Sequence, residues 1–319
     1  MENIVQIDAN FIKQNTIFSE LISELKSGFS TKNVIVPLRH HHDFPNPEIG
    51  VDSTMLLMPA WRPSKEAGVK IIAVSPENHQ FDLPSIQGTY IYLDAKKGTI
   101  KAILEAKSLT AKRTAAASAL ASSFLSRKNS STLLMIGTGV LSTNLIKAHA
   151  TVRPIKTVYI WGRNIEKAES ICKTLANESF SIKAIPNLED YISEVDIISC
   201  ATLTKSPLVL GKILKEGQHI DLVGAYKKDM READDQTIEK ASVFLDTFQG
   251  GLKESGDIAI PLNNGTLKES DIKADLFQLC SGEKSGRNHS SEITLFKSVG
   301  HALEDLVAAT YYYNKFMNE

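Results

Sequence analysis

The pattern of apolar and polar positions changes near residue 115, and the two parts predict different architectures. Before that point, extended candidates at residues 53–58 (STMLLM), 69–74 (VKIIAV) and 88–93 (GTYIYL) are separated by proline and glycine, which is typical of an α+β domain. From about residue 131, apolar strand candidates alternate with helical periods, in the order LLMIG, TVYIWG, SIKAI, VDIISCA, QHIDLVGA and SVFLD. This alternation predicts a doubly wound α/β fold, with a parallel sheet covered by helices on both faces.

The end of the chain predicts one more helix. Residues 298–316 carry apolar side chains at helical spacing, and we expect this helix to return to the first domain. The length of 319 residues suits about two domains, and the hydrophobic content of 42% is enough for a large core.

Composition and charge narrow the function classes. The 36 Lys and Arg residues nearly balance the 37 Asp and Glu residues, so no overall field favours nucleic acid or an anionic membrane, and a small molecule is the expected partner. The opening MENIVQIDANF has no leader pattern, and no apolar run approaches the length of about 18 residues that a membrane span needs, so we expect a cytoplasmic protein. The three cysteines lack paired spacing, which favours reduced thiols.

A glycine-rich turn is the first candidate site. The segment MIGTGVLS (residues 135–142) follows a predicted strand and precedes a predicted helix, the context in which glycines let a backbone approach the pyrophosphate of a dinucleotide. Ser142 stands where the usual motif has its third glycine, and this replacement narrows the approach of strand and helix without blocking phosphate binding. A simple tight turn is the alternative.

The tip of the next strand indicates which nicotinamide cofactor binds. Its sequence is WGRN, and Gly162, Arg163 and Asn164 offer no carboxylate to accept the hydroxyls of an adenosine ribose. Because Arg163 can pair with a 2′-phosphate, NADPH is favoured and NADH remains possible. Arg163 as a solvated loop charge is the alternative reading.

Cationic residues in the first domain are candidates for substrate binding. Arg39 lies in VPLRHHH, Lys70 interrupts an apolar strand, and Arg113 opens the alanine-rich segment LTAKRTAAASALA. Since a buried cation needs an anion and Arg suits the two-point geometry of a carboxylate, these residues predict an anionic substrate. The consecutive histidines 40–42 would point to alternate faces of a strand, so we expect no metal site there.

Six motifs occur in the order VPLR, LLMPAW with GVKII, LTAKRTAAASALA, MIGTGVLS, VDIISCAT and LFKSVGHALEDL. Together they resemble the ornithine cyclodeaminase and mu-crystallin family. The resemblance implies a homodimer in which a Rossmann domain (116–297) is inserted into a substrate-binding and dimerisation domain (1–115 plus 298–319). It also implies that Arg39, Lys70 and Arg113 bind the substrate carboxylate and that Val299 lines the cleft at the nicotinamide. The implied cofactor-binding residues are Gly137, Thr138, Gly139, Val140, Leu141, Gly162, Arg163, Asn164, Thr202 and Ser298.

The family hosts several activities, so one loop decides between them. Cyclodeaminases resemble one another in a GGDCPGK-like stretch whose Asp acts on the substrate amine, whereas this chain reads GAYKKDMRE with Tyr226 at that place. A phenol with a pKa of about 10 is a poor base at neutral pH. The loop is similar to that of the family's ketimine reductases, which act on cyclic imino acids such as Δ1-pyrroline-2-carboxylate. Asp229, nearby in sequence, keeps a cyclodeaminase possible.

The expected reaction is hydride transfer to the carbon of a cyclic imine, giving L-proline if the family's stereochemical face is kept, and L-pipecolate from the six-membered homologue. Lys70, Tyr226 or water could supply the proton, and the sequence does not choose among them. Alanine and opine-like imines are alternative substrates. A mu-crystallin-like NADPH-dependent binding protein is the alternative outside enzymes, although the three cationic anchors favour catalysis.

Overall fold

The structure is a computed structural model that describes residues 4–31 and 33–319. The chain divides into two compact units, Met1–Arg113 with Ala302–Glu319, and Thr114–His301. The first boundary lies two residues, and the second four residues, from those expected from the sequence. Within the described ranges, no helix combines the length and the apolar character needed to cross a membrane.

The first unit contains a mixed six-stranded sheet in the order β1-β6-β5-β4-β3-β2. β1 pairs with β6 in parallel and all other neighbours are antiparallel. The strands are β1 (Val5–Ile7), β2 (His40–Phe44), β3 (Ser53–Trp61), β4 (Glu66–Val74), β5 (Ile86–Asp94) and β6 (Ile100–Glu105). The helical segments are α1 (Ala9–Gln14), α2 (Phe18–Ser30), η1 (Asn78–Phe81) and α11 (Ala302–Met317).

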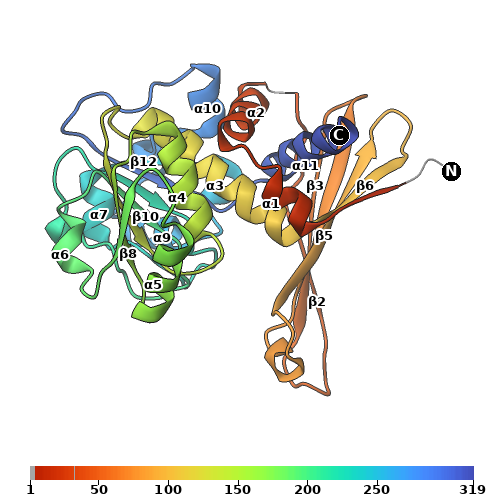
Figure 1. Ribbon diagram of the computed structural model, residues 1–319, viewed down its shortest axis with the longest axis horizontal. Helices are drawn as coiled ribbons and strands as arrows, with labels where there is room; N and C mark the ends of the chain where they lie inside the picture. Colours follow the sequence, from red (N-terminus) through yellow and green to blue (C-terminus); the bar gives the residue numbers. More distant parts are fainter. Residues whose placement is uncertain (1–3, 32) are drawn as a thin grey trace. The chain divides into compact units, whose positions relative to one another are not determined.

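The two faces of this sheet differ in burial, and successive side chains of a strand point to opposite faces. Met58, Lys70, Tyr90 and Leu104 share the buried face. α11 packs on β3, β4 and β5 and against α2 (Figure 1), and thereby brings the carboxyl end of the chain to the centre of the amino-terminal unit. Helix α3 (Ala106–Leu125) follows β6, and its alanines 115–117, 119 and 121 are fully buried.

The second unit contains an eight-stranded, entirely parallel sheet in the order β13-β12-β14-β11-β10-β7-β8-β9. Its strands are β7 (Thr132–Ile136), β8 (Thr157–Trp161), β9 (Ser181–Ala184), β10 (Ile197–Cys200), β11 (His219–Leu222), β12 (Ala241–Leu245), β13 (Ala274–Asp275) and β14 (Ile293–Lys297). Its helical segments are α4 (Ser142–Val152), α5 (Ile165–Thr174), α6 (Glu189–Ile192), η2 (Gly211–Ile213), α7 (Asp235–Lys240), α8 (Phe248–Gly251), α9 (Gly256–Asn264), η3 (Glu269–Asp271) and α10 (Leu276–Ser281). The predicted parallel sheet is confirmed.

The last predicted helix begins later than expected. We expected it from residue 298, whereas α11 starts at Ala302. The reason is the buried carboxylate of Asp246, whose Oδ2 accepts hydrogen bonds from the amides of Val299 and Gly300, each at 2.7 Å. Gly300 has a φ of 85°, a left-handed conformation that ends the preceding extended segment before a helix can form.

Candidate functional site

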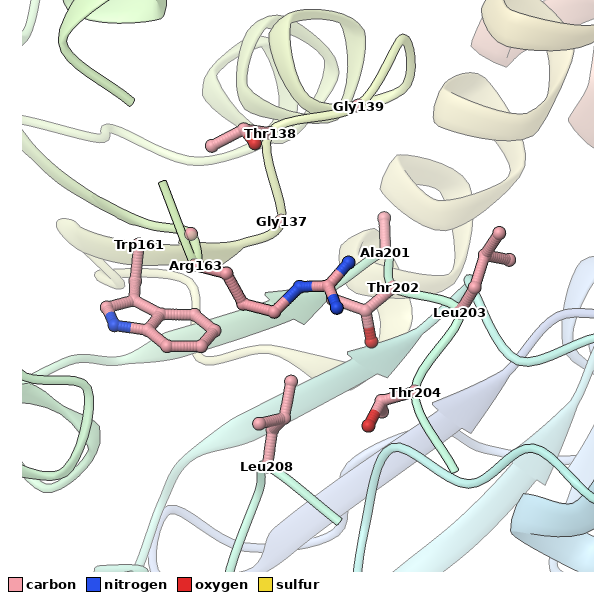
Figure 2. A pocket seen from close by; sticks show the side chains of 11 residues that line it. Gly137, Thr138, Gly139, Trp161, Arg163, Ala201, Thr202, Leu203, Thr204 and Leu208 are labelled. Atoms are coloured by element: carbon pink, nitrogen blue, oxygen red, sulfur yellow. The ribbon is translucent and has the colours of Figure 1, made fainter. Parts of the chain in front are cut away.

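A pocket of about 270 Å³ opens at the carboxyl ends of β7, β8 and β10. β7 lies between β8 and β10, so the chain winds away from it in both directions, and this reversal is where open parallel sheets bind ligands. The lining residues are Gly137, Thr138, Gly139, Trp161, Gly162, Arg163, Ala201, Thr202, Leu203, Thr204 and Leu208 (Figure 2).

The turn after β7 requires glycine at its first position. Gly137 has a φ of 117°, and a Cβ there would lie 2.6 Å from the carbonyl oxygen of Ala201. A Cβ on Gly139 would meet nothing within 4 Å, so the backbone at this point faces open space. The buried hydroxyl of Ser142 donates to the Gly137 carbonyl at 2.8 Å. The serine in place of the third glycine therefore closes the turn with a hydrogen bond.

The tip of β8 supplies Trp161 and Arg163 to the same pocket. In Figure 2 the Arg163 side chain extends from β8 across the pocket, with Trp161 on one side and Ala201 and Thr202 on the other. None of the 11 lining residues is Asp or Glu, so no carboxylate in the pocket opposes the guanidinium. The indole Nε1 of Trp161 donates to the Pro186 carbonyl at 3.3 Å, which fixes the orientation of the ring.

The pocket contains six of the ten residues predicted to bind the cofactor: Gly137, Thr138, Gly139, Gly162, Arg163 and Thr202. The other four lie outside the lining. Val140 is 57% exposed, Leu141 precedes the first turn of α4, and the Asn164 side chain caps α5 by accepting from the Lys167 amide. The Ser298 hydroxyl donates to Asp246 Oδ2 at 3.3 Å. Trp161, Ala201, Leu203, Thr204 and Leu208 were not predicted, and their only signal was their position at strand ends.

The first unit holds a buried cluster of two cations and two carboxylates. Lys70 Nζ lies 2.9 and 2.8 Å from the two carboxylate oxygens of Asp305. Arg113 donates from Nε to Asp305 Oδ1 at 2.9 Å and from Nη1 to Glu304 Oε2 at 2.6 Å. All four residues are at most 5% exposed. The sequence predicts that a substrate anion pairs with these cations, whereas Asp305 and Glu304 of α11 already supply negative charge to them.

Burial and ion pairing act in opposite directions on the charged groups of this cluster. Burial, opposed by Asp305, lowers the pKa of Lys70 to about 8. Burial alone would raise the pKa of Asp305, but Arg113 and Lys70 outweigh it and hold that pKa below its ordinary value. Arg39, half-buried just before β2, acts electrostatically on both Lys70 and Asp305.

The acidic pair on α11 was missed by sequence reasoning. From the sequence, no functional role was assigned to Asp305 or to Glu304. Both side chains are fully buried in a helix that is otherwise largely apolar. Two adjacent acids among apolar helical positions were the available signal, because buried carboxylates require cationic partners.

The loop after β11 carries Tyr226, the position at which the sequence predicts a difference between reductases and cyclodeaminases. Tyr226 is 38% exposed, and the Lys227 ammonium lies 5.7 Å from the centre of its ring. Asp229 forms a surface ion pair with Lys205 at 2.7 Å, and this hydrogen bond holds the pKa of Asp229 below its ordinary value. Asp229 is therefore a solvent-exposed ion-pair partner with weakened basicity.

The fold and the pocket define a Rossmann-type α/β protein with an additional mixed-sheet unit. The chain belongs to the ornithine cyclodeaminase/mu-crystallin family, whose model matches residues 8–319. This confirms the resemblance seen in the six sequence motifs.

Three relatives illustrate the similarity. The chain is 43% identical over 318 residues to an uncharacterized protein of Schizosaccharomyces pombe, covering 95% of this chain and 96% of the relative. It is 37% identical over 306 residues to a Δ1-pyrroline-2-carboxylate reductase of Colwellia psychrerythraea, again covering 95% and 96%. The solved Δ1-pyrroline-2-carboxylate reductase of Thermococcus litoralis, in complex with NADH and L-proline, superposes with a TM-score of 0.92 at 32% identity, covering 99% of this chain and 98% of that chain.

Proposed function

We propose that the protein reduces Δ1-pyrroline-2-carboxylate to L-proline with a nicotinamide cofactor. The observation that carries this choice within the family is the loop after β11, where Tyr226 stands in place of a carboxylate and Asp229 is engaged by Lys205 on the surface. A cyclodeaminase needs a basic group there, whereas a reductase receives its ring already closed. The named relatives from Colwellia and Thermococcus support the same reaction.

The pocket fits a nicotinamide dinucleotide. Gly137 approaches the Ala201 carbonyl more closely than any side chain would allow, and the backbone at Gly139 is open. Both lie between β7 and α4, where backbone amides at the helix start favour a pyrophosphate. When bound, the nicotinamide supplies the hydride. The residues of this chain that would hold the cofactor are those of the pocket, with Gly137, Gly139 and Thr202 as its central backbone contacts.

Arg163 supports a preference for NADPH. Its guanidinium belongs to the pocket lining, and no acidic side chain of that lining competes for it. An arginine at this strand tip can bind a 2′-phosphate through charge-assisted hydrogen bonds. Since the Thermococcus relative was solved with NADH, we expect NADH to bind as well, more weakly than NADPH.

The cation cluster would bind the substrate carboxylate. Lys70 and Arg113 lie side by side on Asp305, and Arg39 acts electrostatically on both Lys70 and Asp305, so these three cations could bind one carboxylate. Asp305 and Glu304 fix the two cations before substrate arrives, so little reorganisation is needed on binding. Lys70, with a pKa of about 8, is protonated at neutral pH and is the best placed proton donor of the cluster. Val299 stays a candidate contact at the nicotinamide.

The six-stranded sheet supports a homodimer. The face opposite Lys70 and Tyr90 carries apolar side chains in register, with Leu57 opposite Ile71, and Val69 opposite both Pro59 and Ile91. These side chains are partly exposed, whereas Met58, Lys70 and Tyr90 on the other face are buried. A contiguous apolar sheet face of this kind is typical of an interface with a second copy.

The proposal is tested with purified protein and a panel of substrates. We expect NADPH absorbance to fall with Δ1-pyrroline-2-carboxylate and with its six-membered homologue, because one methylene changes binding by only about 1 to 3 kcal/mol. Ornithine with NAD should release no ammonia. Ammonia and proline formed from ornithine, with no imine reduction, would replace the reductase by a cyclodeaminase. Binding of NADPH without turnover of any imine would favour a mu-crystallin-like binding protein.

A further inference from the structure

One buried carboxylate, that of Glu232, holds the wall of the pocket from behind. Glu232 is 0% exposed. Its Oε1 accepts from the Thr202 amide at 2.7 Å and from the Thr202 hydroxyl at 2.9 Å. Its Oε2 accepts from the amides of Gly224 at 2.8 Å and Ala225 at 3.1 Å. Each oxygen therefore holds a different loop, one after β10 and one after β11.

These two loops touch through their backbones. A Cβ built on Gly224 would lie 2.0 Å from the Thr202 amide nitrogen and 2.1 Å from its carbonyl oxygen. No residue other than glycine fits that contact without moving one of the loops. Glu232 bonds to the amides on both sides of it, so the carboxylate sets the position of the pocket residue Thr202 against the segment that leads to Tyr226.

The backbone around Glu232 holds the same wall. The Glu232 carbonyl accepts from the amide of the pocket residue Leu208 at 2.8 Å, and the Arg231 amide donates to the carbonyl of the pocket residue Thr204 at 2.9 Å. Three lining positions, Thr202, Thr204 and Leu208, thus depend on the segment 231–232.

The carboxylate is kept in place by a buried cation and a second acid. Lys297 Nζ lies 3.8 Å from Glu232 Oε2 and 2.9 Å from Asp257 Oδ2, and all three side chains are 0% exposed. Asp257 Oδ1 in turn accepts from the Glu232 amide at 2.7 Å. Burial raises the pKa of Glu232 above its ordinary value, and the charge of Lys297 opposes this rise.

We propose that Glu232 is the positioning residue of the cofactor pocket: it fixes the Thr202 wall relative to the loop after β11 without contacting the cofactor itself. This inference rests on the proposed function, since it takes the ligand of the pocket to be a nicotinamide dinucleotide. A wall displaced by about 1 Å is enough to weaken binding and orientation strongly. Glu232→Gln retains the shape but replaces one acceptor oxygen by a donor, so one of the two loops loses its hydrogen bonds.

The chain offers a direct probe of this pocket. It contains two tryptophans, Trp61 and Trp161, and Trp161 lines the pocket. In a Trp61→Phe background, Trp161 fluorescence reports binding of NADPH or NADH without any turnover. A matched control is Asp196→Asn, because Asp196 also accepts several hydrogen bonds, from the Ser131 and Thr132 amides at 2.7 and 3.0 Å, but at the amino end of β7.

We expect Glu232→Gln to weaken the Kd for NADPH by about tenfold or more. Asp196→Asn should lower the melting temperature while leaving that Kd within about twofold, since its hydrogen bonds lie away from the pocket. Hydrogen exchange on the free protein should show faster exchange at the amides of Thr202 or Gly224 in Glu232→Gln only. If Glu232→Gln does not fold, Glu232→Asp keeps the charge beside Lys297 but shortens the side chain by one methylene, so it cannot hold both loops and the Kd should weaken by about fivefold.

The outcomes separate this inference from the proposed function. Wild-type protein that quenches with neither NADPH nor NADH would overturn the proposed function and this inference with it. Wild-type binding together with an unchanged Kd in Glu232→Gln, or in Glu232→Asp if that variant has to be used, would overturn the positioning role alone. A shift of Kd as large in Asp196→Asn as in Glu232→Gln would reduce Glu232 to a general contributor to stability.

Discussion

The pocket of the parallel sheet and the cation cluster of the mixed sheet are built from different kinds of contact. The pocket is lined by the ends of three strands and by the loops that follow them, with Gly137, Gly162 and Ala201 among the lining residues. The cluster joins Lys70 of β4, Arg113 of α3 and Asp305 of α11, which lie up to 235 residues apart in sequence. One region depends on local backbone geometry and is open, whereas the other depends on distant ion pairs and is closed to solvent.

This difference has an energetic consequence. A pocket of turns and strand ends can change its side chains with little effect on the sheet beneath it. In a buried ion cluster, a large desolvation cost is offset by the attraction between the charges. The loss of one member therefore leaves an uncompensated charge in the core. Substitutions in the cluster should therefore affect stability and activity together, while substitutions in the pocket lining should affect binding alone.

The largest effect is expected from Asp305→Ala. It leaves Lys70 and Arg113 buried without the carboxylate that contacts both, and should lower the free energy of unfolding by about 3 to 5 kcal/mol. Urea unfolding followed by fluorescence measures this change. Glu20→Gln, which removes the partner of Lys315 at the surface of the same unit, is the control and should have little effect. Equal losses in the two variants would mean that the cluster is not a linked structure.

Arg163→Ala should separate binding from stability. Loss of a charge-assisted phosphate contact costs about 1.5 to 3 kcal/mol, so the Kd for NADPH should rise by about 10- to 100-fold. The Kd for NADH and the melting temperature should change little. Lys173→Ala, which removes an exposed cation at the end of α5, is the control for the change of net charge. Equal weakening of NADH and NADPH by Arg163→Ala would argue against a 2′-phosphate contact.

Arg113→Lys tests the geometry of the cluster while keeping its charge. A lysine cannot reproduce the two directions in which Arg113 bonds Asp305 and Glu304, so kcat/KM for a carboxylate substrate should fall by about tenfold or more. Arg39→Met should act similarly. Lys107→Arg, on the exposed side of the same helix, should keep full activity. Full activity in both Arg113→Lys and Arg39→Met would show that the substrate carboxylate binds elsewhere.

The pH dependence gives the smallest and most specific signal. Lys70 has a pKa of about 8 against an ordinary 10.5, so kcat/KM should decline as pH rises through about 8 and the ammonium is lost. The unfolded chain binds more protons than the folded chain between these two values, so the contribution of Lys70 to stability should rise over the same range. Lys70→Arg should move the inflection upward, and Tyr226→Phe should leave it in place. A profile that shifts with Tyr226→Phe instead would make Tyr226 the proton donor.

Much of the fold was predictable because buried parallel strands are short apolar runs between segments with helical periodicity. The strands β7, β8, β10 and β11 lie at the predicted positions. The edge strands β1 and β13 were missed, since three and two residues carry little pattern. The pocket turn was predictable because glycines at this spacing between a strand and a helix allow a tight turn and a close approach of the backbone to a phosphate.

The remaining parts depend on contacts that no local pattern encodes. Ser298 stays a predicted cofactor residue, and the hydrogen bond from its hydroxyl to the buried Asp246 could not be read from the sequence. Asp305 and Glu232 received no functional role, although each accepts hydrogen bonds from segments distant in sequence. Their importance comes from burial in the tertiary structure, because a buried carboxylate forms stronger hydrogen bonds and fixes the segments that donate them.

The proposed imine reductase activity is tested most directly by following the hydride from the cofactor to the product. Δ1-Pyrroline-2-carboxylate is incubated with the protein and NADPH that carries deuterium at C4 of the nicotinamide, on each face in turn. We expect L-proline with deuterium at its α-carbon from one labelled face only, formed in step with NADPH oxidation. Proline without deuterium from either labelled cofactor, or no proline while ornithine yields ammonia, would contradict it.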